Sequence, residues 1–159
     1  MLPIHTILHP TDFSQQSEFA FRLAGSLARD YGARLLVLHV VAQPTIAYGE
    51  GVVPPDPELI LEDAERHLHR LAAPDPSIPM ERRLEEGDPV TEILHVAHEI
   101  EADLVVMGTH GRTGLSRLLM GSVAEQVVRR AACPVLTVKT PFPAAIAEPR
   151  RAVEESVVI

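Results

Sequence analysis

The sequence has little of what a disulfide-bonded or membrane-spanning protein needs. It contains one cysteine among 159 residues, so no disulfide can form within the chain, which fits a reducing compartment. No apolar run approaches the roughly 20 residues that span a bilayer, and the N-terminus has no basic segment followed by an apolar one. We therefore expect a cytoplasmic protein with no membrane segment.

Positive charge is also scarce. The chain carries 14 Lys and Arg against 22 Asp and Glu, which gives a formal net charge of −8. Proteins that coat a nucleic-acid backbone need clustered Lys and Arg, so we expect no DNA or RNA partner. A Walker-type Gly-Lys-Ser motif is absent as well, which argues against the usual P-loop.

What is present indicates one folded domain with a short appendage. At 159 residues and 46% hydrophobic content, the chain is long enough to bury a real core. We expect the domain to occupy residues 1–140 and the connection at 42–55, rich in Pro and Gly, to lie on its surface. Residues 141–159 begin with two prolines and show no helical pattern, so this tail is expected to be flexible or docked on its own or a partner subunit.

Hydrophobic periodicity predicts alternating strands and helices. Ser14, Asp56-Pro57 and Asp88-Pro89 are typical helix starts, Gly32 is a typical helix stop, and the prolines from Pro74 onward are expected to end the second helix. The predicted strands cover residues 4–9, 34–41, 80–85, 104–107 and 135–138. The predicted helices cover residues 15–31, 57–72, 89–100 and 122–131.

This alternation predicts a doubly wound three-layer α/β sandwich with a five-stranded, mostly parallel sheet. The charged strand at 80–85 is expected at an edge of that sheet. In such folds ligands bind beyond the carboxyl ends of the strands, where the strand order reverses. The segments Pro10-Thr11-Asp12 and Met107-Gly108, at the ends of the first and fourth strands, are therefore expected to share one crevice.

The stretch after the fourth strand favours phosphate binding. Gly108, Gly111 and Gly121 would let backbone amides approach an anion and would allow positive φ angles. The helix that begins near Ser122 adds unpaired amides and the positive end of its dipole. A local alternative is that Ser122 and Glu125 form a capping box, in which the Ser122 hydroxyl accepts from the Glu125 amide.

The spacing of this loop matches a family motif. Gly108, two residues, Gly111, nine residues and then Gly121-Ser122 resembles the nucleotide motif of the ATP-binding branch of the universal stress protein family. The resemblance extends over about residues 3–139. It includes the opening Ile-Leu-His-Pro-Thr-Asp-Phe-Ser, the Leu-Val-Leu-His-Val strand, the Gly-Asp-Pro before the third helix, and the closing Leu-Met-Gly-Ser-Val-Ala-Glu-Gln.

Membership would imply the strand order 3-2-1-4-5, a homodimer formed through the last strand Val135–Val138, and a nucleotide-dependent role in the stress response. The expected ligand is ATP or AMP, with Mg²⁺ or Mn²⁺ held mainly by phosphate oxygens and by Asp12 at most. Asp12 matches the acidic residue near the ribose or the metal, and Val40 the position whose backbone reads the adenine edge. The expected nucleotide-binding residues are Pro10, Thr11, Asp12, Val40, Met107, Gly108, His110, Gly111, Arg112, Gly121, Ser122 and Val123.

Several alternatives stay open from the sequence. Asp12 is also a common turn or cap residue, and Arg112 is equally well explained as a solvated loop arginine. The eight histidines do not favour a metal site, because structural zinc sites usually draw on several cysteines. Two further functional classes are a slow ATPase or autophosphorylating enzyme, and an interaction module that keeps the fold without a ligand.

Overall fold

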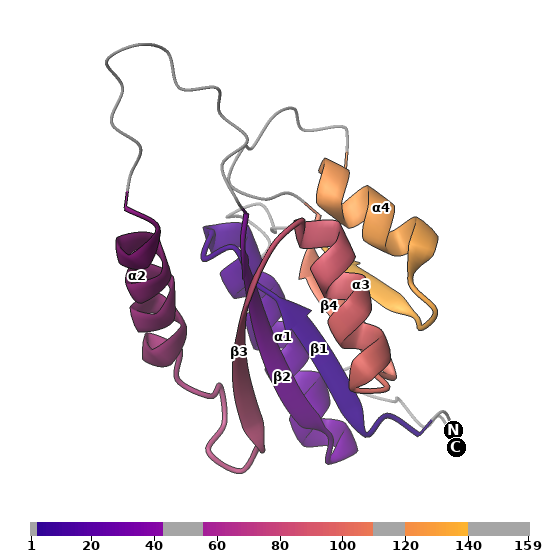
Figure 1. Ribbon diagram of the computed structural model, residues 1–159. Coiled ribbons are helices and arrows are strands. Elements are labelled where there is room, and N and C mark those ends of the chain that lie inside the picture. Colours follow the sequence, from indigo (N-terminus) through magenta and orange to yellow (C-terminus); the bar gives the residue numbers. More distant parts are fainter. Residues whose placement is uncertain (1–2, 43–55, 110–119, 140–159) are drawn as a thin grey trace, which may run out of the picture.

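A computed structural model describes residues 3–42, 56–109 and 120–139, and places nine helices and strands in these ranges (Figure 1). In chain order they are β1 (Thr6–Pro10), α1 (Gln15–Tyr31), β2 (Arg34–Val41), α2 (Pro57–Arg70), β3 (Met80–Glu86), α3 (Pro89–Glu99), β4 (Leu104–Gly108), α4 (Ser122–Arg130) and β5 (Val135–Val138). All strand pairs are parallel and the order across the sheet is β3-β2-β1-β4-β5. The predicted doubly wound fold is confirmed.

Helices cover both faces of the sheet. Side chains alternate between the faces along each strand, so Ile7 packs in the cluster with α1 and α2, whereas Leu8 packs in the cluster with α3 and α4. In Figure 1, α3 and α4 lie over the near face and α1 lies behind the sheet. The strands β1, β2 and β4 are therefore buried on both sides, which explains their nearly continuous apolar sequences.

The predicted helix caps are confirmed. The side chains of Ser14, Asp56 and Asp88 accept hydrogen bonds from backbone amides at the starts of α1, α2 and α3. Gly32 adopts the left-handed conformation, with φ of 65°, and ends α1. These local contacts fix where each helix begins relative to the strand that precedes it.

Some element boundaries differ from the prediction. The first strand runs from Thr6 to Pro10 instead of over residues 4–9, and α4 ends at Arg130. The second helix ends at Arg70, before the prolines that were expected to stop it and before two residues expected on its apolar face. Arg82 on β3 donates to the carbonyl of Leu71, the first residue beyond the helix, and so ties this helix end to the sheet.

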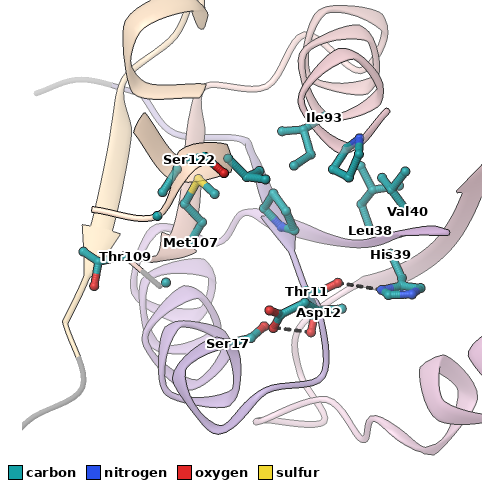
Figure 2. Close-up of a pocket in the computed structure, with 16 residues that line it drawn as sticks. Thr11, Asp12, Ser17, Leu38, His39, Val40, Ile93, Met107, Thr109 and Ser122 are labelled. Atoms are coloured by element: carbon teal, nitrogen blue, oxygen red, sulfur yellow. Dashed lines mark hydrogen bonds between the residues drawn. The ribbon is translucent and has the colours of Figure 1, made fainter. Parts of the chain in front are cut away.

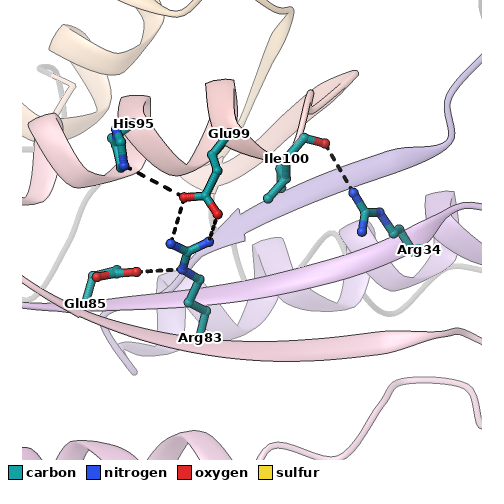
Figure 3. A network of polar contacts seen from close by, with 6 residues as sticks. All are labelled: Arg34, Arg83, Glu85, His95, Glu99 and Ile100. Carbon is teal, nitrogen blue, oxygen red and sulfur yellow. Dashed lines mark hydrogen bonds and ion pairs between the residues drawn. The ribbon is translucent and has the colours of Figure 1, made fainter.

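The edge strand β3 is fastened to α3 by charged side chains (Figure 3). The Arg83 guanidinium donates to both carboxylate oxygens of Glu99, each at 2.8 Å, and to Glu85 at 2.6 Å. These hydrogen bonds hold the pKa of Glu99 below its usual range. Arg34 donates to the Ile100 carbonyl at the end of the same helix. The charged side chains of this edge strand thus anchor it to α3.

Other predictions concern different parts of the chain. No helix within the described residues is long and apolar enough to cross a membrane. The Cys133 thiol packs beside the α3 and α4 cluster, and burial raises its pKa, so the environment does not activate it as a nucleophile. The predictions for residues 43–55 and for the tail at 141–159 lie outside the described residues.

Candidate functional site

A cavity of about 330 Å³ opens where the strand order reverses, between the carboxyl ends of β1 and β4 (Figure 2). This volume lies in the range of about 300–1,000 Å³ that is typical of small-molecule sites. Nine of the residues predicted from the sequence line it, namely Pro10, Thr11, Asp12, Val40, Met107, Gly108, Gly121, Ser122 and Val123. His110, Gly111 and Arg112 lie outside the described residues. The fold thus gathers residues that are more than 100 positions apart in the chain.

The turn after β1 is held by its own side chains. The Thr11 amide donates to the Leu38 carbonyl at 2.8 Å, and the Thr11 hydroxyl oxygen accepts from the Phe13 amide and from the Ser17 hydroxyl. Phe13 has a φ of 61°, a left-handed conformation that is uncommon for a large side chain. One Asp12 oxygen accepts from the Ser14 amide at 3.0 Å. Asp12 is therefore a turn residue, as the local alternative expects, and it also lines the cavity.

Val40 presents its peptide group to the cavity side of β2. Along a strand the backbone N–H and C=O of alternate residues point to the same side. The Leu38 carbonyl faces β1, because it accepts from Thr11, and the Val41 carbonyl faces β3, because it accepts from Gly87. Val40 consequently faces the β1 side, but the β1–β2 pairing ends at Leu38 with Pro10. Its N–H and C=O lie beyond the last paired residue.

The start of α4 supplies a set of backbone donors. The Gly121 amide donates to the Thr109 carbonyl at 2.7 Å, and the Gly121 carbonyl accepts from the Glu125 amide at 2.9 Å. The first helical amides, at Ser122, Val123 and Ala124, have no partner within the helix, and all three residues line the cavity. The cavity thus meets the positive end of the helix dipole.

The local alternative for Ser122 is wrong, and two of the glycines do not use the freedom that their sequence allows. Gly121 is the N-cap and makes no side-chain cap, and Ser122 is the first helical residue, so the Ser122–Glu125 capping box does not form. Positive φ angles are not used at Gly108 or Gly121 either: among the described glycines only Gly32 and Gly87 have them. At Gly121 the φ is −61°, which any residue can adopt. Glycine at this position leaves the backbone beside the cavity without a side chain.

The cavity combines an apolar wall with a polar end. Leu38, Ile93 and Met107 contribute aliphatic and thioether surface, whereas the α4 amides and the Asp12 loop contribute donors and acceptors. Within the described part of the lining, Asp12 is the residue that carries a carboxyl group. This arrangement suits a ligand that has a flat apolar portion and an anionic portion.

A comparison with protein families agrees with this geometry. The family model described as the universal stress protein family matches residues 3–139, a range that includes every residue the structure describes. The chain belongs to the universal stress protein family. A universal stress protein of Methanocaldococcus jannaschii is 38% identical over 139 residues, which cover 85% of this chain and 82% of the relative.

Solved structures of related proteins have the same fold. A protein solved as a structural-genomics test case is 28% identical, has a TM-score of 0.75, and covers 88% of this chain and 99% of its own. A universal stress protein crystallised in complex with cAMP is 26% identical, has a TM-score of 0.59, and covers 87% of this chain and 99% of its own. The expected strand order 3-2-1-4-5 agrees with the topology found here.

Sequence reasoning missed part of the lining of this universal stress protein cavity. The additional residues are Ser17, Leu38, His39, Pro89, Ile93, Thr109 and Ala124. Leu38 and His39 precede Val40 on β2, so a broader view of that strand end would have included them. Pro89 and Ile93 lie on α3, and only the packing of α3 over the sheet brings them to the cavity.

The described side chains do not make a metal site by themselves. Among residues 3–42, 56–109 and 120–139, no group of three or more His, Cys, Asp or Glu side chains is arranged to hold an ion. Among the described residues, Asp12 is the carboxylate that lines the cavity and could contribute one oxygen to a cation held mainly by a ligand.

Proposed function

We propose that this universal stress protein binds an adenine nucleotide in the cavity between β1 and β4. The observation that carries the proposal is that two backbone features line the same cavity. One is the Val40 peptide group on β2, and the other is the set of amides at the start of α4 that have no partner within the helix. The first suits the edge of a base, and the second suits a phosphate. The apolar wall between them suits the face of a purine.

The Val40 backbone favours adenine over guanine. A strand residue offers one N–H donor and one C=O acceptor side by side. Adenine presents an acceptor at N1 next to a donor at its amino group, which complements that pair. Guanine presents a donor at N1 and an acceptor at O6, which is the opposite order along the same edge. We therefore infer that GTP binds more weakly than ATP or AMP.

The phosphate end has donors but carries no positive side chain among the described lining residues. The amides of Ser122, Val123 and Ala124, together with the Ser122 hydroxyl, would hold the phosphate chain. Asp12 adds negative charge nearby, and a bound Mg²⁺ or Mn²⁺ would neutralise it against the phosphates of ATP. AMP has a single phosphate and would need less positive charge from a cation. Met107 and Gly108 would contact the ribose from the end of β4.

The universal stress protein crystallised with cAMP supports adenine binding in a related chain. We infer that nucleotide occupancy regulates this protein in a stress response, within a domain of residues 1–140. A homodimer through β5 is part of the proposal. This strand pairs with β4 alone in the sheet, and Leu136 on β5 is 38% exposed. Its outer edge is therefore suited to another copy.

Amide chemical-shift mapping tests the location of the ligand. Adding AMP to ¹⁵N-labelled protein should shift the amide signals of Val40, Ser122 and Val123 in a saturable manner. The amide signals of Ala97 and Cys133, at the opposite end of the sheet, should stay within the noise and serve as controls. Shifts centred on those two residues, or no shifts with any adenine nucleotide, would contradict the proposed site.

A further inference from the structure

His39 makes a contact that bears on how the cavity reads its ligand. Its Nδ1 atom lies 2.7 Å from the Thr11 carbonyl oxygen, a hydrogen bond drawn in Figure 2. A carbonyl oxygen only accepts, so Nδ1 carries the proton and donates. The side chain is half-buried, and its ring packs on Phe13 with centroids 4.3 Å apart. Phe13 in turn packs on His67 of α2. The hydrogen bond to Thr11 and the ring contact with Phe13 thus both hold the imidazole in place.

The position of the Thr11 carbonyl decides whether the Val40 N–H forms a hydrogen bond within the sheet or can donate to a ligand. Thr11 already donates its amide to Leu38. The next rung of a parallel ladder would join the Val40 N–H to the Thr11 carbonyl and extend the β1–β2 pairing by one step. This rung is not formed between the described residues: the ladder stops at Pro10 with Leu38, and the Thr11 carbonyl accepts from His39 instead.

The direction of the His39 side chain explains why the rung is absent. Side chains alternate along β2, so His39 lies on the same face as Val37, which packs toward α1 and α2. Its bond to Thr11 therefore draws the carbonyl out of the plane of the sheet and away from Val40. The left-handed Phe13, two residues later, continues this turn away from the ladder.

We propose that His39 is a positioning residue for base selectivity: by holding the Thr11 carbonyl, it keeps the Val40 N–H open to the edge of adenine. The inference rests on the proposed function. It adds that selectivity for adenine depends on a side chain that need not touch the nucleotide. A donor-free side chain at this position would let the Val40 N–H pair with Thr11 and compete with the base.

The test compares His39→Leu, and the smaller donor-free variant His39→Ala, with His39→Asn, whose side-chain amide places a donor near the position of Nδ1. Calorimetric titrations with ATP, GTP and inorganic triphosphate are made on each full-length protein. We expect both donor-free variants to lose about 3- to 10-fold in the ATP-to-GTP affinity ratio, as one hydrogen bond predicts, with unchanged affinity for inorganic triphosphate. His39→Asn should recover most of the ratio.

Hydrogen exchange of the Val40 amide in the unliganded protein gives a second readout. Exchange should be slower in His39→Leu than in the wild type, because the new rung protects that N–H, and it should return to the wild-type rate in His39→Asn. A wild-type protein that binds neither nucleotide overturns the proposed function, and the selectivity role falls with it. The other outcome concerns His39 only. If the wild type prefers ATP, and the donor-free variants keep both the ATP-to-GTP affinity ratio and the Val40 amide exchange rate of the wild type, the role of His39 is overturned while the proposed function stands.

Discussion

Replacing His9 should remove a large part of the acid sensitivity of this protein. His9 lies on β1 and is fully buried, with its Nδ1 atom 2.8 Å from the Val106 carbonyl oxygen and its ring 5.5 Å from that of Phe21. Its Nε2 atom is buried without a hydrogen-bond partner among the described residues. Burial lowers the pKa of His9 from 6.5 to about 4, against opposing contributions from Val106 and Asp12.

The sign and size of the effect follow from this shift. Between about pH 6.5 and pH 4 the unfolded chain binds a proton at His9 that the folded chain does not, so stability falls as the pH falls. A shift from 6.5 to about 4 corresponds to roughly 3 kcal/mol in total, of which about 2 kcal/mol is lost between pH 7 and pH 4.5.

The assay is urea denaturation of the wild type and His9→Asn at pH 7 and at pH 4.5. Asparagine keeps a donor near the Nδ1 position and does not titrate. The variant should be less stable at pH 7 because it loses packing, but its free energy of unfolding should fall by about 2 kcal/mol less on acidification. The exposed His69→Asn serves as the control and should keep the wild-type dependence. Equal losses in the wild type and His9→Asn would refute the assignment.

Three further substitutions test other parts of the account. Gly121→Val should abolish ATP binding, because the valine side chain would fill the approach to the α4 amides. The melting temperature should change little, because valine can adopt the φ of −61° found at this position. Unchanged affinity for ATP would contradict the site. Gly25→Ala should destabilise the protein by about 1 kcal/mol or more in urea denaturation, because a Cβ at this position would lie 2.5 Å from Pro74. A gain in stability would show instead that α1 can shift to make room. Arg83→Met should lower the free energy of unfolding by about 1 kcal/mol, more than Arg22→Met in an exposed pair, and equal losses would mean that the β3 anchor contributes nothing special.

The parts of the fold that follow local rules could be predicted from the sequence. Asp88 before Pro89 marks a helix start through contacts within four residues, and the apolar run at Arg34–Val41 could be assigned as a doubly buried strand with the bounds that the structure has. Gly32 ends α1 because its left-handed conformation is cheap only for glycine. Such signals do not depend on how distant segments pack.

Other features depend on distant partners and escaped prediction. The second helix ends at Arg70, and just beyond that end the Leu71 carbonyl accepts from Arg82, on a strand that follows later in the chain. The Ser122 capping box fails because Gly121 is fixed to Thr109 and takes the cap position one residue earlier. The local sequence holds no information on these contacts with distant residues, so it could not predict that they would prevail over a local hydrogen bond.

The candidate site shows the same division. The glycine spacing and the strand ends pointed to residues that the fold brings to one cavity, whereas His39 went unnoticed because its importance lies in a hydrogen bond across 28 positions. Histidines at strand ends are common and carry no spacing signal. Only the geometry of the Thr11 carbonyl gives this one a role.

Equilibrium binding of ATP, AMP and GTP to the purified wild-type protein, with and without Mg²⁺, tests the central claim most directly. Isothermal titration calorimetry should give saturable binding of the adenine nucleotides at one site per chain, with GTP weaker. Selective binding should also raise the melting temperature with nucleotide concentration. Absence of heat and of thermal stabilisation with either adenine nucleotide, at millimolar concentration and with Mg²⁺ present, would contradict the account and favour an interaction module that has kept the universal stress protein fold without its ligand.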